Sequence, residues 1–146
     1  MKRAPRKNIK RNFCFACGAD NPDGMHLKFS LDPEEPIVRG VFSFARRYQG
    51  PPDGLHGGVI ATLVDEAMGK LNRRDGIVAL TAEMTVEYLR MVPLGRKIFV
   101  EARPTGHLGR NYWRKCTICD SEGKLLVRGR GRFVKVAVRE DPSDPE

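Results

Sequence analysis

The sequence has 146 residues, 40% of them hydrophobic, and carries a formal net charge of +8. This length supports one core of ordinary size, which excludes two independent domains of ordinary size, and no apolar run reaches the roughly 18 residues of a membrane helix. The first residues, MKRAPRKNIKRN, lack the apolar stretch of a secretory signal. We therefore expect a cytoplasmic protein that has no membrane partner. The positive charge favours a polyanionic partner, a class that includes nucleic acid, anionic lipid and phosphate-bearing small molecules such as coenzyme A.

The two ends of the chain differ in composition from its middle. Residues 1–12 are rich in Lys and Arg, which predicts a flexible basic arm, and residues 139–146 are polar and contain proline, which predicts a flexible tail. We therefore expect one folded domain over residues 13–138.

The first predicted elements are two strands and a helix. Residues 25–31 and 37–44 alternate between apolar and polar side chains, which predicts an antiparallel pair of strands. A Gly- and Pro-rich stretch follows, and then residues 59–74 predict a helix of about four turns. Its apolar side chains recur at helical spacing, at positions 59, 60, 63, 64, 67, 68 and 71.

After Gly76 the sequence period changes to two, which predicts a long half-buried strand. Its side chains divide between two faces, with Ala82, Met84, Val86 and Tyr88 on one and Thr81, Glu83, Thr85 and Glu87 on the other. Turns predicted at 93–95, 106–109 and 121–124 then separate three more strands, over 97–104, 111–120 and 125–138.

This order of elements predicts an α+β fold in which one antiparallel sheet of about six strands wraps around one long helix. A single helix cannot cover such a sheet. We therefore expect a second copy of the chain to cover the remaining apolar surface and the strand edges, which makes the protein at least a homodimer.

A chemically suggestive segment is Leu55-His56-Gly57-Gly58-Val59, at the start of the predicted helix. The first N–H groups of a helix lack partners within the helix, and its dipole places partial positive charge there. Because Gly57 and Gly58 have no Cβ, a substrate can approach the backbone closely. The segment suits the stabilisation of an oxyanion, although a tight turn with a partly buried His56 would explain it structurally.

Asp65 lies seven residues after Gly58, nearly on the same helical face and two turns further on. It interrupts an apolar run, so its carboxylate is placed to act as a base or a nucleophile. Two turns span roughly 11 Å, so Asp65 cannot reach a carbonyl held at Gly57 of its own chain. The two groups can meet only across a subunit interface. The structural alternative is that Asp65 and Glu66 are solvated positions on a surface helix.

The segments LHGGVIATLVDEAMG, LTAEMTVEYLRMVPLG and GKLLVRGRGRFV together resemble the hotdog-fold acyl-CoA thioesterases of the phenylacetate-pathway (PaaI-like) type. The resemblance covers about residues 13 to 138, and it implies that this domain is a hotdog thioesterase domain. In that family the sheet wraps a long central helix, and paired subunits form dimers that often associate further into dimers of dimers.

The resemblance also implies roles for individual residues. The backbone N–H of Gly57, after the motif histidine His56, corresponds to the oxyanion donor, and Asp65 corresponds to a carboxylate that acts from the neighbouring subunit. Thr81 corresponds to a threonine that assists the attacking water. The implied reaction is hydrolysis of an acyl-CoA thioester without a cofactor, in which Asp65 either activates water or attacks the carbonyl directly.

Coenzyme A carries several phosphate charges, and basic side chains after the long strand are candidates to meet them. The set predicted to bind substrate beside Gly58 is Arg90, Arg96, Lys97, Arg110 and Arg114. Each of these could equally be a solvated charge at a strand end.

Two cysteine pairs, Cys14-x-x-Cys17 and Cys116-x-x-Cys119, raise the question of a zinc site. The pairs are 98 residues apart, and Cys116 and Cys119 lie in a predicted strand, where residues three apart face opposite sides. We therefore expect free thiols and no metal.

Two other functions remain open. Arg128, Arg130 and Arg132 alternate along the last predicted strand and could track the phosphates of a nucleic acid, but no recognition helix or stacking platform accompanies them, so a nucleic-acid partner is not expected. A hotdog protein that binds acyl-CoA without turning it over is the other alternative, against which Asp65 argues.

Overall fold

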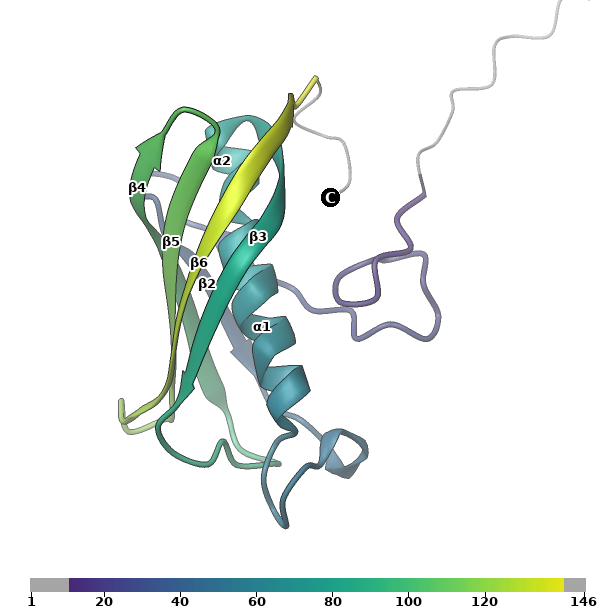
Figure 1. The fold of residues 1–146 in the computed structure, drawn as a ribbon. Helices are drawn as coiled ribbons and strands as arrows, with labels where there is room; N and C mark the ends of the chain where they lie inside the picture. Colours follow the sequence, from purple (N-terminus) through teal and green to yellow (C-terminus); the bar gives the residue numbers. More distant parts are fainter. Residues whose placement is uncertain (1–10, 141–146) are drawn as a thin grey trace, which may run out of the picture.

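Residues 11–140 are described by a computed structural model, in which a six-stranded antiparallel sheet curves around one helix (Figure 1). The strands are β1 (Ser30–Leu31), β2 (Val38–Phe42), β3 (Ile77–Tyr88), β4 (Ile98–Leu108), β5 (Asn111–Cys119) and β6 (Leu125–Val138). Their order across the sheet is β1-β2-β4-β5-β6-β3, with every neighbouring pair antiparallel. This arrangement confirms the predicted hotdog fold. The predicted arm 1–12 and tail 139–146 lie almost entirely outside the described residues.

The central helix, α1 (Gly57–Gly69), packs its apolar face against the sheet. The periodic residues predicted for this face are buried, namely Ile60, Leu63, Val64, Ala67 and Met68. Full burial of such side chains contributes about 1.5–3 kcal/mol each. The helix begins two residues earlier than predicted. It is also interrupted at Lys70, after which the short α2 (Leu71–Asp75) ends at Gly76 in the left-handed conformation, with φ of 66°.

Helix α1 approaches β6 so closely that a Cβ at either of two glycines of this strand would crowd the helix side chains. A Cβ on Gly129 would lie 2.4 Å from Cγ1 of Val64, and one on Gly131 would lie 3.0 Å from Cε of Met68. The glycines of the RGRGR sequence therefore face the helix, and the arginines between them face outward. Close helix–sheet packing accounts for this alternation.

Strand β3 contains a bulge that changes which side chains face the helix. Thr81 pairs with Phe133, but Glu83 already pairs with Arg132, so Ala82 is an extra residue in β3. The predicted alternation placed Thr81 on the same face as Glu83. The structure corrects this, because the bulge turns Thr81 to the side of the buried Phe133 and of α1.

Two strand boundaries also differ from the prediction. Of the predicted strand 25–31, only Ser30–Leu31 joins the sheet, because the N–H groups of Met25 and Leu27 donate to Phe15 and Ala16 in the preceding segment. The turn predicted at 106–109 is shorter, because β4 continues to Leu108 past a register shift at 104/106 and reverses at Gly109, with φ of 58°.

The α-helices of residues 11–140 are α1 and α2, and neither is long and apolar enough to cross a membrane.

Candidate active site

The start of α1 has one backbone N–H group that is free to bind a ligand. His56 caps the helix, with its Nδ1 accepting the Gly58 N–H at 2.9 Å, and its carbonyl accepts the N–H groups of Val59 and Ile60 at 3.0 Å each. Among residues 11–140, no acceptor contacts the N–H of Gly57. The four donors without an i→i−4 partner are those of residues 56–59: Tyr48 accepts that of His56, and His56 accepts those of Gly58 and Val59. The remaining one, on Gly57, is available to an oxyanion.

Tyr88, at the end of β3, contacts the next peptide, between Gly57 and Gly58. Its hydroxyl donates to the Gly57 carbonyl at 2.9 Å, and its ring lies 3.7 Å from where a Cβ on Gly57 would stand. Sequence reasoning placed Tyr88 only on a strand face. No short-range pattern connects residues 57 and 88, and the contact arises because β3 runs alongside α1 in the opposite direction.

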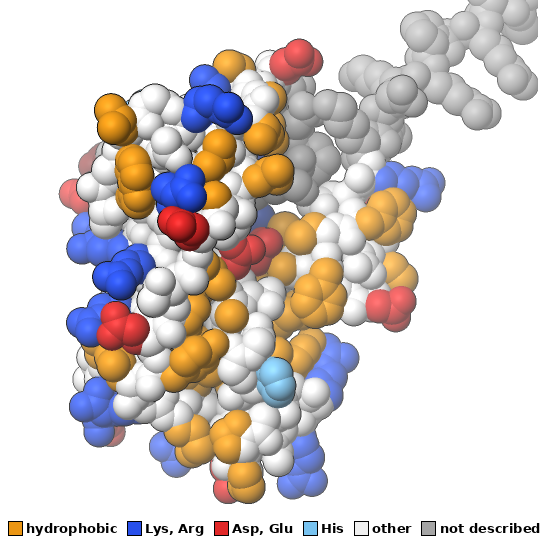
Figure 2. Space-filling view, viewed as in Figure 1, with side chains coloured by type: hydrophobic (Ala, Val, Ile, Leu, Met, Phe, Trp, Pro, Cys, Tyr) orange, Lys and Arg blue, Asp and Glu red, His pale blue; other side chains and the backbone are white. Residues whose placement is uncertain are grey.

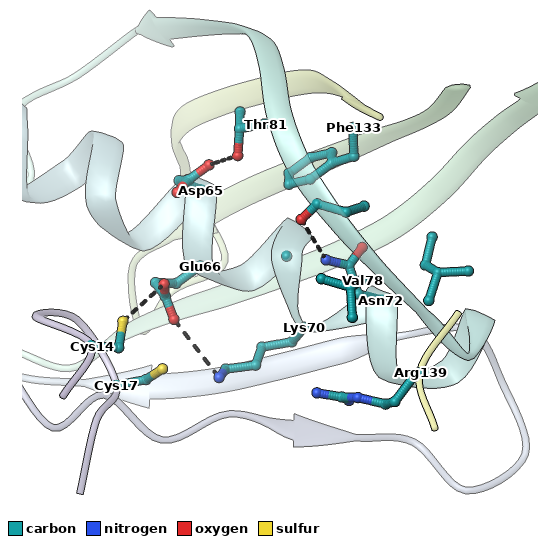
Figure 3. Close-up of a pocket in the computed structure, with 13 residues that line it drawn as sticks. Cys14, Cys17, Asp65, Glu66, Lys70, Asn72, Val78, Thr81, Phe133 and Arg139 are labelled. Carbon is teal, nitrogen blue, oxygen red and sulfur yellow. Dashed lines mark hydrogen bonds and ion pairs between the residues drawn. The ribbon is translucent and has the colours of Figure 1, made fainter. Parts of the chain in front are cut away.

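Asp65 of α1 and Thr81 of β3 lie together in the structure. Oγ1 of Thr81 donates to Oδ1 of Asp65 at 2.6 Å, as Figure 3 shows. Within the described part of the chain, the second carboxylate oxygen of Asp65 has no hydrogen-bond donor. Thr81 thus orients the carboxylate while one oxygen remains free to take a proton or to attack.

These two parts of the site are separate within one chain. Asp65 is eight residues along α1 from Gly57, which corresponds to about 12 Å at 1.5 Å per residue. The geometry of a single chain therefore supplies an oxyanion donor and a carboxylate, but not both at one substrate carbonyl.

Asp65 and Thr81 line a hollow of about 280 Å³ between the N-terminal segment, α1 and the start of β3. Its apolar wall includes Ile77 and Phe133. On the face seen in Figure 2, acidic side chains lie in the hollow between the body of the molecule and the N-terminal segment. The hollow is a candidate for part of an acyl pocket.

The polar wall of the same hollow is formed by Cys14, Cys17, Glu66 and Lys70. The interpretation of Glu66 as a solvated residue is wrong, because its side chain is only 17% exposed. Lys70 Nζ lies 3.7 Å from one of its carboxylate oxygens, and the Cys14 thiol donates to the other at 3.9 Å. Burial, together with the Glu66 carboxylate, raises the pKa of the Cys17 thiol to about 12, against the opposing effect of Lys70.

The predicted phosphate-binding residues do not form one cluster. Arg90, Arg96 and Lys97 are exposed on the loop after β3, which contacts the start of α1 through backbone pairing of residues 54 and 55 with 93 and 92. Arg110 is exposed in the β4–β5 turn, next to the opposite end of β6, where its Nε donates to the Lys135 carbonyl. The loop that carries the first three therefore packs against the segment that leads into α1.

The placement of Arg114 contradicts its predicted role as a phosphate contact. The residue is 1% exposed and lies between the sheet and the helices. Its guanidinium donates to the Met68 carbonyl at 2.7 Å, to Oδ1 of Asn72 at 2.6 Å and to Oδ2 of Asp75 at 2.7 Å. Arg114 thus ties the end of α1 to α2, because a buried guanidinium needs several acceptors to offset its desolvation.

The structure also bears on the arginine stripe of β6. Arg128 pairs with Glu87 at 2.9 Å and Arg132 pairs with Glu83 at 3.1 Å across the β3–β6 ladder. Two of its three charges are therefore matched by carboxylates of the neighbouring strand, which weakens the case for a phosphate track.

The two cysteine pairs do not combine into one site. Cys116 is buried in β5, and among residues 11–140 the metal-ligating side chains that gather near Cys14 and Cys17 include neither Cys116 nor Cys119. A four-cysteine zinc site is therefore not formed.

The sequence of the chain is similar to those of known proteins. Residues 54–114 match the thioesterase superfamily. The acyl-coenzyme A thioesterase THEM4 of Rattus norvegicus is 31% identical over 126 residues, which cover 84% of this chain and 53% of that protein. The Bos taurus THEM4 protein is 30% identical over 136 residues, covering 92% of this chain and 56% of its own length. The chain thus spans about half the length of the curated relatives that it matches.

Solved structures show the same fold. A crystal structure of a thioesterase superfamily protein has a TM-score of 0.74 and 29% identity, and covers 80% of this chain and 60% of its own. A Streptococcus mutans protein bound to acetyl CoA has a TM-score of 0.71 at 18% identity, covering 77% of this chain and 92% of its own. The E. coli PaaI protein has a TM-score of 0.68 at 17% identity, covering 72% and 76%. Residues 54–114 of this chain thus match the thioesterase superfamily by sequence, and the whole domain shares the fold of its solved members.

Proposed function

We propose that the protein is an acyl-CoA thioesterase whose reaction centre is completed by two subunits. Two features of α1 carry this proposal. Among residues 11–140, the N–H of Gly57 at the start of the helix has no acceptor, and Asp65, further along the helix, is oriented by Thr81 of β3. An oxyanion donor and a carboxylate base or nucleophile together suffice for a mechanism of thioester hydrolysis. The similarity to acyl-coenzyme A thioesterases supports the same substrate class.

In the proposed reaction, the thioester carbonyl oxygen accepts the Gly57 N–H of one subunit. Asp65 of the other subunit either removes a proton from water as the water attacks the carbonyl carbon, or attacks the carbon itself to form an anhydride that water then hydrolyses. In both routes the carbon–sulfur bond breaks, the sulfur leaves as coenzyme A thiolate and takes up a proton, and the acyl group leaves as a carboxylate. Tyr88 and His56 hold the Gly57 peptide in place throughout.

The edge of the sheet supports the pairing of subunits. Strand β3 is 12 residues long and lies at the end of the strand order, with Val78 42% exposed and Leu80 62% exposed. A long edge strand with exposed apolar side chains favours association. Pairing of two β3 edges would also bring the helices of two subunits side by side, which is what an Asp65–Gly57 site between subunits requires.

The experiment measures thiol release from short aliphatic, long aliphatic and aryl acyl-CoAs by the protein and two variants. Asp65→Asn keeps the shape of the side chain and removes the base, so we expect kcat to fall by about 10²–10⁴-fold. Gly57→Pro removes the N–H at the first helical position, where proline is well tolerated, and we expect a loss of about 10²–10³-fold.

Gly57→Ala is the matched control, because it keeps the N–H and its Cβ would make only an ordinary contact with Tyr88. We expect it to lose much less activity than Gly57→Pro. Full activity of Asp65→Asn would overturn the mechanism. Binding of acyl-CoA without release of thiol from any panel member would instead support a protein that binds acyl-CoA without turnover.

A further inference from the structure

Three metal-ligating side chains gather beside the hollow. The Sγ atoms of Cys14 and Cys17 and a carboxylate oxygen of Glu66 all lie within 4.8 Å of one another, and Cys14 Sγ is 3.9 Å from Oε1 of Glu66. Around one tetrahedral zinc ion, with Zn–S of about 2.3 Å and Zn–O of about 2.1 Å, a sulfur and an oxygen ligand stand about 3.6 Å apart and two sulfurs about 3.8 Å apart. Small side-chain rotations bring the three donors to one ion.

The turn that carries the two cysteines presents both thiols toward α1 (Figure 3). The N–H of Gly18 donates to the Cys14 carbonyl at 2.9 Å, which closes the turn over Cys14-Phe-Ala-Cys17. A Cβ at residue 18 would lie 2.4 Å from the Cys14 nitrogen, so this turn requires glycine. The proposed hydrolysis does not use the Cys-x-x-Cys-Gly spacing. The turn explains it, because this spacing places both thiols on the side of α1.

The charges of the cluster suit a divalent cation. Two thiolates and one carboxylate carry three negative charges, a divalent ion neutralises two of them, and the ammonium of Lys70, 3.7 Å from Oε2 of Glu66, matches the third. The side chains of Lys70 and Glu66 are only 19% and 17% exposed, so an unbalanced charge here would be costly. Thiolate ligands favour zinc over magnesium or calcium.

We propose that Cys14, Cys17 and Glu66 bind one zinc ion. The ion fastens the N-terminal segment, which is otherwise held by the buried Ala16 and Leu27, to α1 at the residue next to Asp65. Its fourth position, taken by water, faces the hollow that Asp65 and Thr81 line. This ligand set replaces the expectation of no metal, because α1 supplies the third ligand that the cysteine spacing alone did not reveal.

The test uses the full chain, kept reduced, stripped of metal with a chelator and then titrated with Zn²⁺ in competition with a chromophoric chelator. We expect one tightly bound equivalent and an unfolding midpoint that rises with zinc concentration. Co²⁺ in place of Zn²⁺ should give a sulfur-to-cobalt charge-transfer band. Cys14→Ser, Cys17→Ser and Glu66→Gln should each weaken zinc binding by more than about tenfold, because even the loss of a residue that only hydrogen-bonds a ligand costs about 10–100-fold in metal affinity.

Two variants serve as controls, because each retains the three ligands. Cys119→Ser removes a thiol outside the cluster, and Asp65→Asn removes the proposed catalytic carboxylate, so both should bind zinc as the unmodified protein does. If a cysteine variant fails to fold, Glu66→Gln and the cobalt spectrum of the unmodified protein decide the question. Absence of tight binding, absence of the charge-transfer band, or unchanged affinity in Glu66→Gln would overturn the assignment. Zinc binding is measured without thioester hydrolysis, so either proposal can fail alone.

Discussion

The peptide between Gly57 and Gly58 is held by two side chains, one of them from a residue distant in sequence. Nδ1 of His56 accepts a hydrogen bond from the Gly58 N–H, and the hydroxyl of Tyr88 donates one to the Gly57 carbonyl. The preceding peptide carries the Gly57 N–H, and it is held through its own carbonyl, that of His56, which accepts the N–H groups of Val59 and Ile60. An oxyanion donor acts best when it is already oriented before the charge develops.

Tyr88→Phe removes one hydroxyl and keeps the ring against Gly57. We expect kcat for acyl-CoA hydrolysis to fall by about two- to tenfold with little change in KM, since a neutral hydrogen bond contributes about 0.5–1.5 kcal/mol. Steady-state kinetics measure the effect. Unchanged kcat would show that the hydroxyl does not position the Gly57 peptide for catalysis.

Cys116 should make stability depend on pH in the alkaline range. Burial, with a smaller contribution from Glu101, raises the pKa of the Cys116 thiol from 9.0 to about 12. Between these values the unfolded chain loses this proton while the folded chain keeps it, so the free energy of unfolding falls as pH rises, by about 1.4 kcal/mol per pH unit. Below the unfolded pKa the contribution is fully present.

Urea midpoints at about pH 8 and about pH 10.5 measure this dependence, with Cys116→Ala as the matched variant. The variant should start less stable, because it leaves a small cavity, but should lose less stability on going to the higher pH. Equal losses in both proteins would contradict the assignment to Cys116, since the remaining titrating groups are common to both.

At the scale of elements, contact between α1 and β6 sets the depth at which the helix sits under the sheet. Gly129 and Gly131 allow this approach, and β3, beside β6, carries Thr81 toward Asp65 through its bulge. The position of the Asp65 carboxylate, the proposed catalytic group, therefore depends on how closely a helix and a strand pack.

Gly129→Ala should destabilise the protein by about 1–3 kcal/mol, because the new Cβ would stand 2.4 Å from a branched, fully buried Val64 side chain. Val64→Ala removes the clashing methyl groups at the cost of a cavity. In the double variant the two effects should partly cancel, with a coupling of about 0.5–3 kcal/mol in denaturant unfolding. Strictly additive losses would show that the helix moves away instead of clashing.

At the scale of the whole molecule, a site divided between two subunits makes a prediction that a single-chain site does not. Asp65→Asn and Gly57→Pro each inactivate both sites of their own homodimer. In a mixed dimer, one site combines the intact Gly57 of the first chain with the intact Asp65 of the second. Co-expression of the two variants in equal amounts should therefore restore about a quarter of the unmodified activity, because half of the dimers are mixed and each has one complete site.

Separately purified homodimers, assayed without exchange, are the control and should remain inactive. Failure of co-expressed chains to recover activity, with mixed dimers confirmed by differently tagged chains, would place Gly57 and Asp65 in one subunit's site and overturn the proposed assembly.

Local sequence patterns sufficed to determine much of this protein. The helical spacing at residues 59–71 predicted the buried face of α1, and the order of strands predicted the antiparallel sheet around it, because both periods follow from backbone geometry alone. The glycines at the start of α1 likewise indicated a free backbone N–H there, since N–H groups without helical partners are a property of every helix start.

Only the tertiary structure decided the features that depend on contacts between distant segments. The bulge at Ala82 does not interrupt the apolar–polar alternation of β3, yet it turns Thr81 toward Asp65. Arg114 was predicted to be a surface charge, but α1 and α2 surround it with acceptors. Glu66 joins two cysteines from a segment about 50 residues away. In each case the position of the side chain depends on burial and on hydrogen bonds or ion pairs with residues far away in the sequence. The spacing of apolar and polar residues along the chain does not reveal such contacts.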